Sequence, residues 1–313
     1  MHWLVHSYDG RMNPRISIVI PVYQRGAELR RALRSLASQS CMNFEVLIAD
    51  DGSNPPAEEV ASEFRASLSI RCLALPHSGR PARPRNAAVA ASRAEWISFL
   101  DSDDTWDMDR IAVLDSYLRD GVDVVHHRLR ICCEPTRSPA SRIGFRPRAV
   151  GSGFGRRSAV DHLASVGNTV AMSGATVRRD MLVSLGGFDE ELPCNDDYDL
   201  WMRLALAGAR FQYIDRVLGT YWTGGLSISG SGERGILARQ RFREKYAQDL
   251  SPQFRRRMDA RLDYMDAVAA LSSGKYDAAS FPALKFTEFP RYWIAIRVRR
   301  AASYATSLLP RPR

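Results

Sequence analysis

Two aspartates, Asp101 and Asp103, stand where their carboxylates could bind a metal ion. They flank Ser102 directly after an apolar run at residues 96–100. A strand end can aim two alternate side chains at one ligand, and hard divalent cations prefer carboxylate oxygens. Solvated acids in a turn, or a cap for the next helix, would give the same residues. The pair alone leaves both interpretations open.

Two further acidic pairs allow other roles. Asp50 and Asp51 close an apolar run, where a carboxylate could accept hydrogen bonds from a base or ribose, although the glycine and serine that follow also favour a turn. Asp196 and Asp197 open a later helical stripe. Acids at a helix start stabilise its dipole, but two adjacent acids exceed what capping requires. One of them could act as a general base toward an attacking hydroxyl.

Two more side chains could contact a nucleotide. Tyr23 follows the first apolar run and could stack on a base, although a lone aromatic after a strand more often packs. Arg85 stands at the opening of an expected helix, where it could contact a diphosphate or simply be exposed. Residues 21–23 and the acids at 50–51 and 101–103 are all expected at one edge of one sheet. This convergence favours the nucleotide interpretation.

Alternating apolar runs and helical stripes predict the framework that holds these residues. The expected strands are 16–20, ended by Pro21, then 44–49, 70–75, 96–100 and 122–125; the expected helices are 28–39, 57–66, 85–94 and 108–119. Such alternation predicts an α/β fold with a mostly parallel, doubly wound sheet. Ligands of these sheets bind beyond the carboxyl ends of the strands, which is where the acids fall.

The pattern changes in the second half of the chain. We expect a charged loop at 128–157, a strand at 169–177, a turn at 186–189, an acidic helix at 196–207, and helices without strands from Glu233 onward. The chain therefore divides into an N-terminal extension (1–14), a nucleotide-binding α/β domain (15–225) and a basic helical C-terminal extension (226–313).

Composition limits the class of protein. With 45% hydrophobic and 25% charged residues, the chain is not expected to be disordered. Its five cysteines are odd in number and lack paired spacing, which suggests neither a disulfide framework nor a zinc site. There is no run of 18 apolar residues and no apolar leader at the start, which argues against a transmembrane span or a signal peptide. We expect a cytoplasmic protein, with peripheral attachment to the inner face of the cell membrane left open.

The net charge of +9 is unevenly distributed. Eight arginines and one acid lie between Arg128 and Arg157, and six arginines and no acid lie between Pro290 and Arg313. These stretches could meet phosphates on a nucleotide, a lipid carrier or an anionic membrane. The second stretch also holds aromatic and aliphatic residues, so it could be an interfacial helix or a helix packed on the α/β domain with a basic outer face. No nucleic-acid partner is expected, because no nucleic-acid-binding signature accompanies the charge.

Six segments, taken in order, resemble the family 2 glycosyltransferases with the GT-A fold. They read SIVIPVY at 17–23, FEVLIADDGS at 44–53, PRN at 84–86, EWISFLDSDD at 95–104, GGFD at 186–189 and DDYDLW at 196–201. The resemblance covers roughly residues 15–221. It implies a Rossmann-like, mostly parallel sheet flanked by helices. It also implies transfer of a sugar from a nucleotide-sugar donor to a hydroxyl of a glycan or lipid-linked saccharide, as in polysaccharide biosynthesis at the cell surface.

The resemblance implies roles for residues on the donor side. The ends of the first two strands would hold the nucleoside, which maps to Pro21, Tyr23 and Asp51. Asp101 and Asp103 would bind a divalent cation, Mg²⁺ or Mn²⁺, together with the donor diphosphate, and Asp103 is the more direct ligand.

The resemblance also implies a catalytic base. In the family the late acidic pair usually reads Glu-Asp, and its second member serves as the base, which maps to Asp197. Here Asp196 replaces the glutamate, and this shorter side chain leaves Asp196 as the alternative.

The implied reaction is a single in-line displacement, in which the base deprotonates the acceptor and the cation offsets charge on the leaving diphosphate. One displacement means inversion, while a retaining route through a covalent intermediate stays open. The alternative function is a non-catalytic nucleotide- or glycan-binding module on the same fold. A nucleotidyltransferase would carry a Gly-rich phosphate loop after the first strand, where this chain reads PVYQR at 21–25.

Overall fold

The computed structural model describes residues 14–133, 149–223, 233–272 and 289–307. Within them the chain forms two compact units. The first unit takes in residues up to 155, 169–190 and 196–227, and the second takes in 156–168, 191–195 and 228–313. The domain boundaries at residues 14 and 225 stay predictions.

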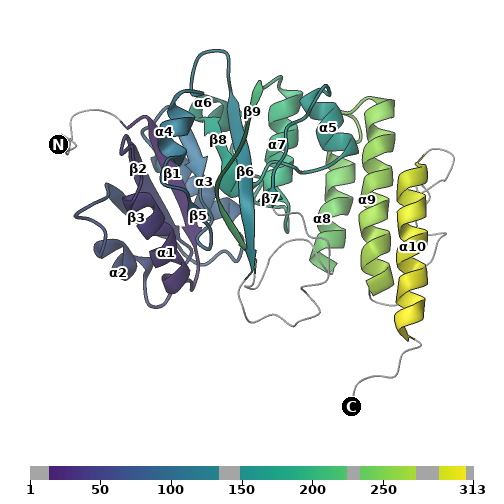
Figure 1. Ribbon diagram of the computed structural model, residues 1–313, viewed down its shortest axis with the longest axis horizontal. Coiled ribbons are helices and arrows are strands. Elements are labelled where there is room, and N and C mark those ends of the chain that lie inside the picture. Colours follow the sequence, from purple (N-terminus) through teal and green to yellow (C-terminus); the bar gives the residue numbers. More distant parts are fainter. Residues whose placement is uncertain (1–13, 134–148, 224–232, 273–288, 308–313) are drawn as a thin grey trace. The chain divides into compact units, whose positions relative to one another are not determined.

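Four parallel strands form one half of the sheet in the first unit, as the alternating pattern predicts (Figure 1). They are β1 (Ile16–Val22), β2 (Phe44–Asp50), β3 (Ile70–Ala74) and β4 (Trp96–Phe99), in the order β3-β2-β1-β4. The connecting helices are α1 (Gly26–Ala37), α2 (Ala57–Ser62) and α3 (Ala82–Ala91). Every residue of β1 and β2 is buried, which explains why these strands read as continuous apolar runs.

The sheet continues beyond β4 with strands of mixed direction. These are β8 (Ala175–Arg178), β6 (Val124–Cys133), β9 (Phe211–Thr223), β5 (Thr105–Trp106) and β7 (Ala149–Val150). β8 lies between β4 and β6 and is antiparallel to both, whereas β6 and β9 are parallel. The helices α4 (Arg110–Asp115), α6 (Arg179–Ser184) and α7 (Asp196–Leu206) complete the unit. The nine-stranded sheet is therefore parallel in its first half and mixed in its second.

Pro21 does not end the first strand. β1 continues through it to Val22, in register with β2. The carbonyl of Val19 accepts a hydrogen bond from Leu100 N–H, so the backbone groups of Val19 point toward β4. Residues two apart in a strand point to the same side, so the backbone nitrogen of Pro21 also points toward β4. β4 ends at Phe99, before it reaches Pro21. A proline at this position removes no bond from the ladder.

Three other expectations differ from the structure. The segment 169–177, expected to be a strand, is a strand only from Ala175, in β8, and a 3₁₀ helix (Met172–Gly174) precedes it. The segment 128–157, expected to be a loop, contains the second half of β6 and the short strand β7, while residues 134–148 lie outside the described residues. The long strand β9 was not predicted at all. It pairs with β6 along most of its length, and register shifts beside Arg128 interrupt that ladder.

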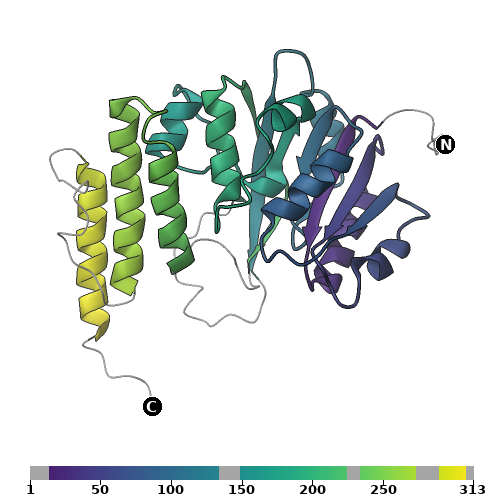
Figure 2. The ribbon, with the colours of Figure 1, turned by 180° about the vertical axis from the view of Figure 1, so that it is seen from behind.

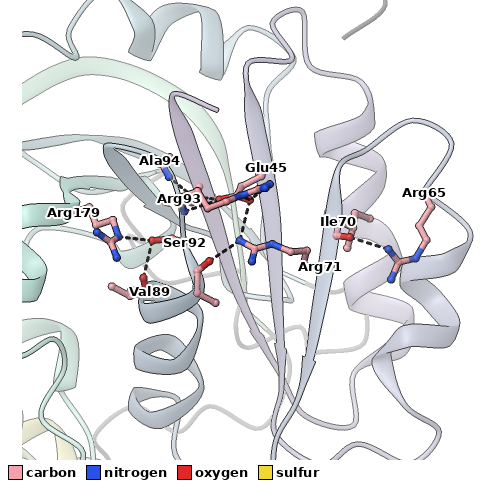
Figure 3. A network of polar contacts seen from close by, with 11 residues as sticks. Glu45, Arg65, Ile70, Arg71, Val89, Ser92, Arg93, Ala94 and Arg179 are labelled. Atoms are coloured by element: carbon pink, nitrogen blue, oxygen red, sulfur yellow. Dashed lines mark hydrogen bonds and ion pairs between the residues drawn. The ribbon is translucent and has the colours of Figure 1, made fainter. Parts of the chain in front are cut away.

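A buried carboxylate ties the parallel strands together at the edge of the sheet opposite their carboxyl ends (Figure 3). Glu45 on β2 accepts hydrogen bonds from Ser17 Oγ at 2.7 Å, Arg71 Nη2 at 3.0 Å and Arg93 N at 2.9 Å. Burial opposes ionisation of Glu45, but these bonds and the charge of Arg71 lower its pKa below the usual value. β1, β2 and β3 are thus held in register at one edge, which fixes their opposite ends.

The second unit is helical in its described residues. It contains α5 (Ala159–Ser165), α8 (Glu233–Lys245), α9 (Pro252–Ser272) and α10 (Pro290–Ser307). α8, α9 and α10 lie side by side, from green to yellow in Figure 2. On α10 the side chain of Ile296 is buried, and Tyr292 stacks on Tyr264 of α9 with ring centroids 5.2 Å apart. Of the helices in the described ranges, none is both long enough and apolar enough to cross a membrane.

Candidate active site

A buried arginine connects two of the acidic motifs at the carboxyl edge of the sheet. Arg85 donates from Nη2 to Asp101 Oδ1 at 2.6 Å and from Nη1 to Asp196 Oδ2 at 2.7 Å. Arg85 is only 5% exposed, because α3 begins at Ala82 and the first turn of this helix directs the Arg85 side chain toward the interior. Burial opposes the charge of Arg85, but Asp101 and Asp196 outweigh it and raise its pKa. The structure therefore brings Asp101 and Asp196 together through Arg85, which is a permanent cation.

The turn after β4 is held by a hydrogen-bonded serine. Ser173, in the 3₁₀ helix η2 (Met172–Gly174), accepts a bond from Asp101 N–H at 3.0 Å and donates one to Asp104 Oδ2 at 2.5 Å. Asp104 also accepts from Trp222 N–H at 3.0 Å and is 1% exposed. Burial, followed by the charge of Asp101, raises the pKa of Asp104 well above its ordinary value. Asp104 therefore anchors the turn, whereas the side chains of Asp101 and Asp103 stay partly exposed.

Asp103 is paired with a cation from the loop after β1. Arg25 forms an ion pair with the Asp103 carboxylate, and Arg31 Nη2 donates to its backbone carbonyl at 2.7 Å. Burial, and then the charge of Asp101, raises the pKa of Asp103 despite Arg25. The carboxylates of Asp101 and Asp103 thus repel one another, and each forms an ion pair with an arginine.

These carboxylates fit a divalent cation that is shared with a substrate. Among the described residues, no three His, Cys, Asp or Glu side chains are grouped so that they could hold a metal alone. Mg²⁺ is commonly bound by one or two carboxylates together with substrate phosphates. Asp101 and Asp103 supply such a pair, and their mutual repulsion would be relieved by a cation.

The part of the site that is predicted to hold the nucleoside is an aromatic stack beside a buried acid. Tyr23, 43% exposed, stacks on His77 with ring centroids 3.9 Å apart. Asp51 accepts hydrogen bonds from Ser78 N–H at 2.8 Å and Gly79 N–H at 3.1 Å, and it pairs with His77 Nδ1 at 3.0 Å. Asp51 thus fixes the loop that presents His77 to Tyr23. Direct contact of Asp51 with a nucleoside stays a prediction.

The predicted turn at 186–189 positions the start of α7. The Asn86 side chain on α3 pairs with Phe188, accepting from its N–H at 2.8 Å and donating to its carbonyl at 2.9 Å. Gly187 has φ +73°, and a Cβ there would lie 2.4 Å from Asn86 Oδ1. Arg203 on α7 donates to the Gly187 carbonyl at 2.7 Å and to Asp199 at 2.8 Å. α7, which carries both candidate bases, is thereby tied to α3.

Asp196 and Asp197 occupy different environments at the start of α7. Asp196 is 7% exposed and bound to Arg85, whereas Asp197 is half-buried. Asp197 Oδ1 accepts a bond from Tyr198 N–H at 2.7 Å. Of the two adjacent carboxylates, Asp197 is the more accessible.

Comparison with known proteins identifies the family. The model of Glycosyl transferase family 2 matches residues 17–182, which is more than half of the chain. The chain belongs to this family. A pre-mycofactocin glycosyltransferase of Mycobacterium tuberculosis is 31% identical over 210 residues, covering 66% of this chain and 42% of the relative. The chain thus spans less than half the length of that relative.

Two solved structures show that the chain has a GT-A fold. Staphylococcus aureus TarS 1–349 in complex with UDP-GlcNAc superimposes with a TM-score of 0.60 at 20% identity, over 91% of this chain and 79% of that one. Mannosyltransferase PcManGT from Pyrobaculum calidifontis, in complex with GDP-Man and Mn²⁺, gives 0.52 at 16% identity, over 96% and 88%. Both comparisons agree with the predicted fold class.

The candidate site also contains residues that the sequence did not predict. Tyr221 on β9 is the clearest, because burial, then the charges of Asp104, Asp101, Asp103 and Asp197, raise its pKa to about 12. Its phenol therefore stays protonated beside acids from both halves of the site. The others are His77, Arg25 and Ser173. Arg25 ends the segment PVYQR at 21–25, which contains no glycine. No sequence motif singled out Ser173.

Proposed function

We propose that this glycosyltransferase moves a sugar from a nucleotide-sugar donor to an acceptor hydroxyl, with a divalent cation and with inversion at the anomeric carbon. The observation that carries the proposal is the Arg85 bridge. It joins Asp101, on the predicted donor side, to Asp196, one of the two candidate catalytic bases. A donor diphosphate near Asp101 and Asp103 would then place its sugar toward α7.

The donor side fits a nucleotide. The Tyr23–His77 stack offers an aromatic face to a base. Proteins of the same fold have been solved with UDP-GlcNAc and with GDP-Man and Mn²⁺, which supports the donor class and the cation. When bound, the cation would offset the negative charge that develops on the leaving diphosphate.

The reaction then needs one base and one displacement. Asp197 takes the proton of the acceptor hydroxyl, whose oxygen bonds to the anomeric carbon as the bond to the diphosphate breaks and its electron pair leaves with the nucleotide. Arg85 holds Asp196 in a buried ion pair, so the adjacent Asp197 is held at the edge of the site. A single displacement inverts the anomeric centre.

A nucleotide screen tests this function. At a concentration about 100 times its Kd, the correct nucleotide among UDP, GDP, dTDP and CMP should raise the Tm by about 5–10 °C with Mn²⁺, and less in EDTA. The matching sugar nucleotide should then be consumed, with the product sugar inverted. If no nucleotide stabilises the protein, the proposal is wrong. Stabilisation without any turnover would instead indicate the non-catalytic module.

We further propose a glycan or lipid-linked acceptor, reached from the inner face of an anionic membrane. The outward face of α10 carries Ile294 and Val298, which are 50% and 63% exposed, with Arg297 beside them. Exposed aliphatic residues among arginines are typical of helices that lie in a membrane interface. α10 packs through its opposite face on α9, a helix of the same second unit, so this packing leaves the outward face open to an interface.

The outward face of α10 can be tested without disturbing its packing. Ile294→Ser with Val298→Ser should lower binding to anionic vesicles several-fold at low salt, because apolar area is lost from the interface. The matched control is Ile236→Ser with Leu237→Ser on α8, whose side chains are 46% and 44% exposed. The attachment would be refuted if the unmodified chain ignored the vesicles in sedimentation, or if both pairs behaved alike.

A further inference from the structure

The two arginine-rich stretches of the sequence have no part in the proposed sugar transfer, yet they meet at one cavity in the second unit. Arg157 closes the first stretch and Arg291 opens the second. The cavity has a volume of about 420 Å³ and is lined by Arg157, Asp161, Ser165, Arg257, Phe289, Pro290 and Arg291. Three arginines and a single carboxylate therefore line this cavity.

Asp161 makes two of these arginines converge. Arg257 Nη1 on α9 binds Asp161 Oδ1, and Arg157 Nε lies 3.8 Å from Asp161 Oδ2. The side chain of Asp161 is 18% exposed, whereas those of Arg157 and Arg257 are 50% and 36% exposed. One carboxylate thus holds two guanidinium groups whose outer edges remain open to a ligand.

Arg291 is held in place without a carboxylate. Its Nη2 donates to the Ser165 carbonyl and to the Tyr292 hydroxyl, both at 2.8 Å. The Tyr292 hydroxyl also donates to Ser165, and its ring stacks on Tyr264. Within the described parts of the chain, Arg291 forms no ion pair. The cavity therefore carries about two positive charges in excess of its single acid.

We propose that this cavity binds a phosphate group. The planar forks of arginines match the oxygens of phosphate, and a phosphate monoester with nearly two negative charges complements the excess charge of the cavity. The volume falls within the range of small-ligand sites. If Asp161 served only to hold α5 against α9, a single arginine paired with it would be enough. The phosphate belongs either to a lipid headgroup or to a soluble ester.

The test uses the full chain and two phosphate probes. Glycerol 3-phosphate is the soluble probe, followed by calorimetry. Phosphatidic acid in phosphatidylcholine vesicles is the membrane probe, compared in sedimentation with cholesteryl hemisuccinate vesicles of equal charge. Arg257→Gln should lower affinity for at least one phosphate probe about tenfold, because a charge-assisted hydrogen bond is lost. It should also remove any preference for phosphatidic acid over hemisuccinate.

Matched variants separate the cavity from general charge. Arg256→Gln removes the same charge from an exposed neighbour on α9 and should leave the phosphate preference intact. If Arg257→Gln lowers the Tm strongly, Arg157→Gln repeats the test, because its ion pair with Asp161 is longer. A defect limited to vesicles assigns the site to a lipid, and one seen with glycerol 3-phosphate assigns it to a soluble ester. If the cavity variants match Arg256→Gln with both probes, the proposal is overturned. Sugar transfer to a soluble acceptor should be unchanged in every variant.

Discussion

Replacing Asp103 by asparagine should remove nearly all sugar transfer while the protein stays folded. A neutral amide is a poorer ligand for Mg²⁺ or Mn²⁺, so the charge that develops on the diphosphate would be uncompensated. Metal assistance contributes several kcal/mol to the transition state, so turnover should fall by more than about 10²-fold. Burial and Asp101 already raise the pKa of Asp103, so loss of its charge relieves repulsion in the free protein. The Tm should therefore change little.

Donor turnover against Mn²⁺ concentration, measured for both proteins, gives the readout. The control is Asp107→Asn, since Asp107 is a nearby carboxylate that pairs with Arg130 at 3.5 Å instead. This control should need the same Mn²⁺ concentration as the unmodified protein. Full activity of the unmodified protein in excess chelator would refute the metal role.

The parallel strands explain why the location of this site could be predicted. β1, β2 and β4 are adjacent and parallel, so the residues that follow them meet at one edge whatever the rest of the chain does. Tyr23, Asp51 and Asp101 each follow one of these strands. The apolar runs locate the strands, and the strands locate the acids. The sequence therefore predicts the donor side from local patterns.

The environment of each arginine could not be predicted in the same way. Arg85 was expected to contact a diphosphate or to be exposed, but it is buried against Asp196, which is 111 residues away in sequence. Arg110 is fully buried as well, with Nε 2.8 Å from His127 Nε2 and its guanidinium 3.4 Å from the Trp106 ring. Burial lowers the pKa of Arg110 well below its ordinary value. Arginines are mostly exposed in proteins, and only tertiary packing supplies the partners that allow these two to be buried.

β9 was missed for a related reason. Asp215 and Arg216 are exposed and interrupt its alternation of apolar and polar residues, and register shifts break its ladder with β6. What identifies this segment as a strand is pairing with β6, which begins almost 90 residues earlier. Without β9, nothing in the sequence placed Tyr221 beside the carboxylates.

Asp197→Asn is expected to lower turnover by about 10²-fold or more while donor affinity stays within a few fold, because only general-base assistance is lost. Asp197 is half-buried and accessible at the start of α7. Asp196 is buried and bound to Arg85, so Asp196→Asn should act differently. It would leave Arg85 with Asp101 alone and weaken donor binding, with a smaller effect on turnover.

The two variants are matched controls for one another, since they make the same substitution at adjacent positions. Single-turnover rates at saturating donor, together with donor affinity from calorimetry, separate the two effects. For Asp197→Asn the rate should fall and the affinity should hold, whereas for Asp196→Asn the affinity should fall more than the rate. If Asp196→Asn is the inactive protein and Asp197→Asn transfers sugar normally, the base is Asp196. The ion pair with Arg85 would then have to open during each turnover to free that carboxylate.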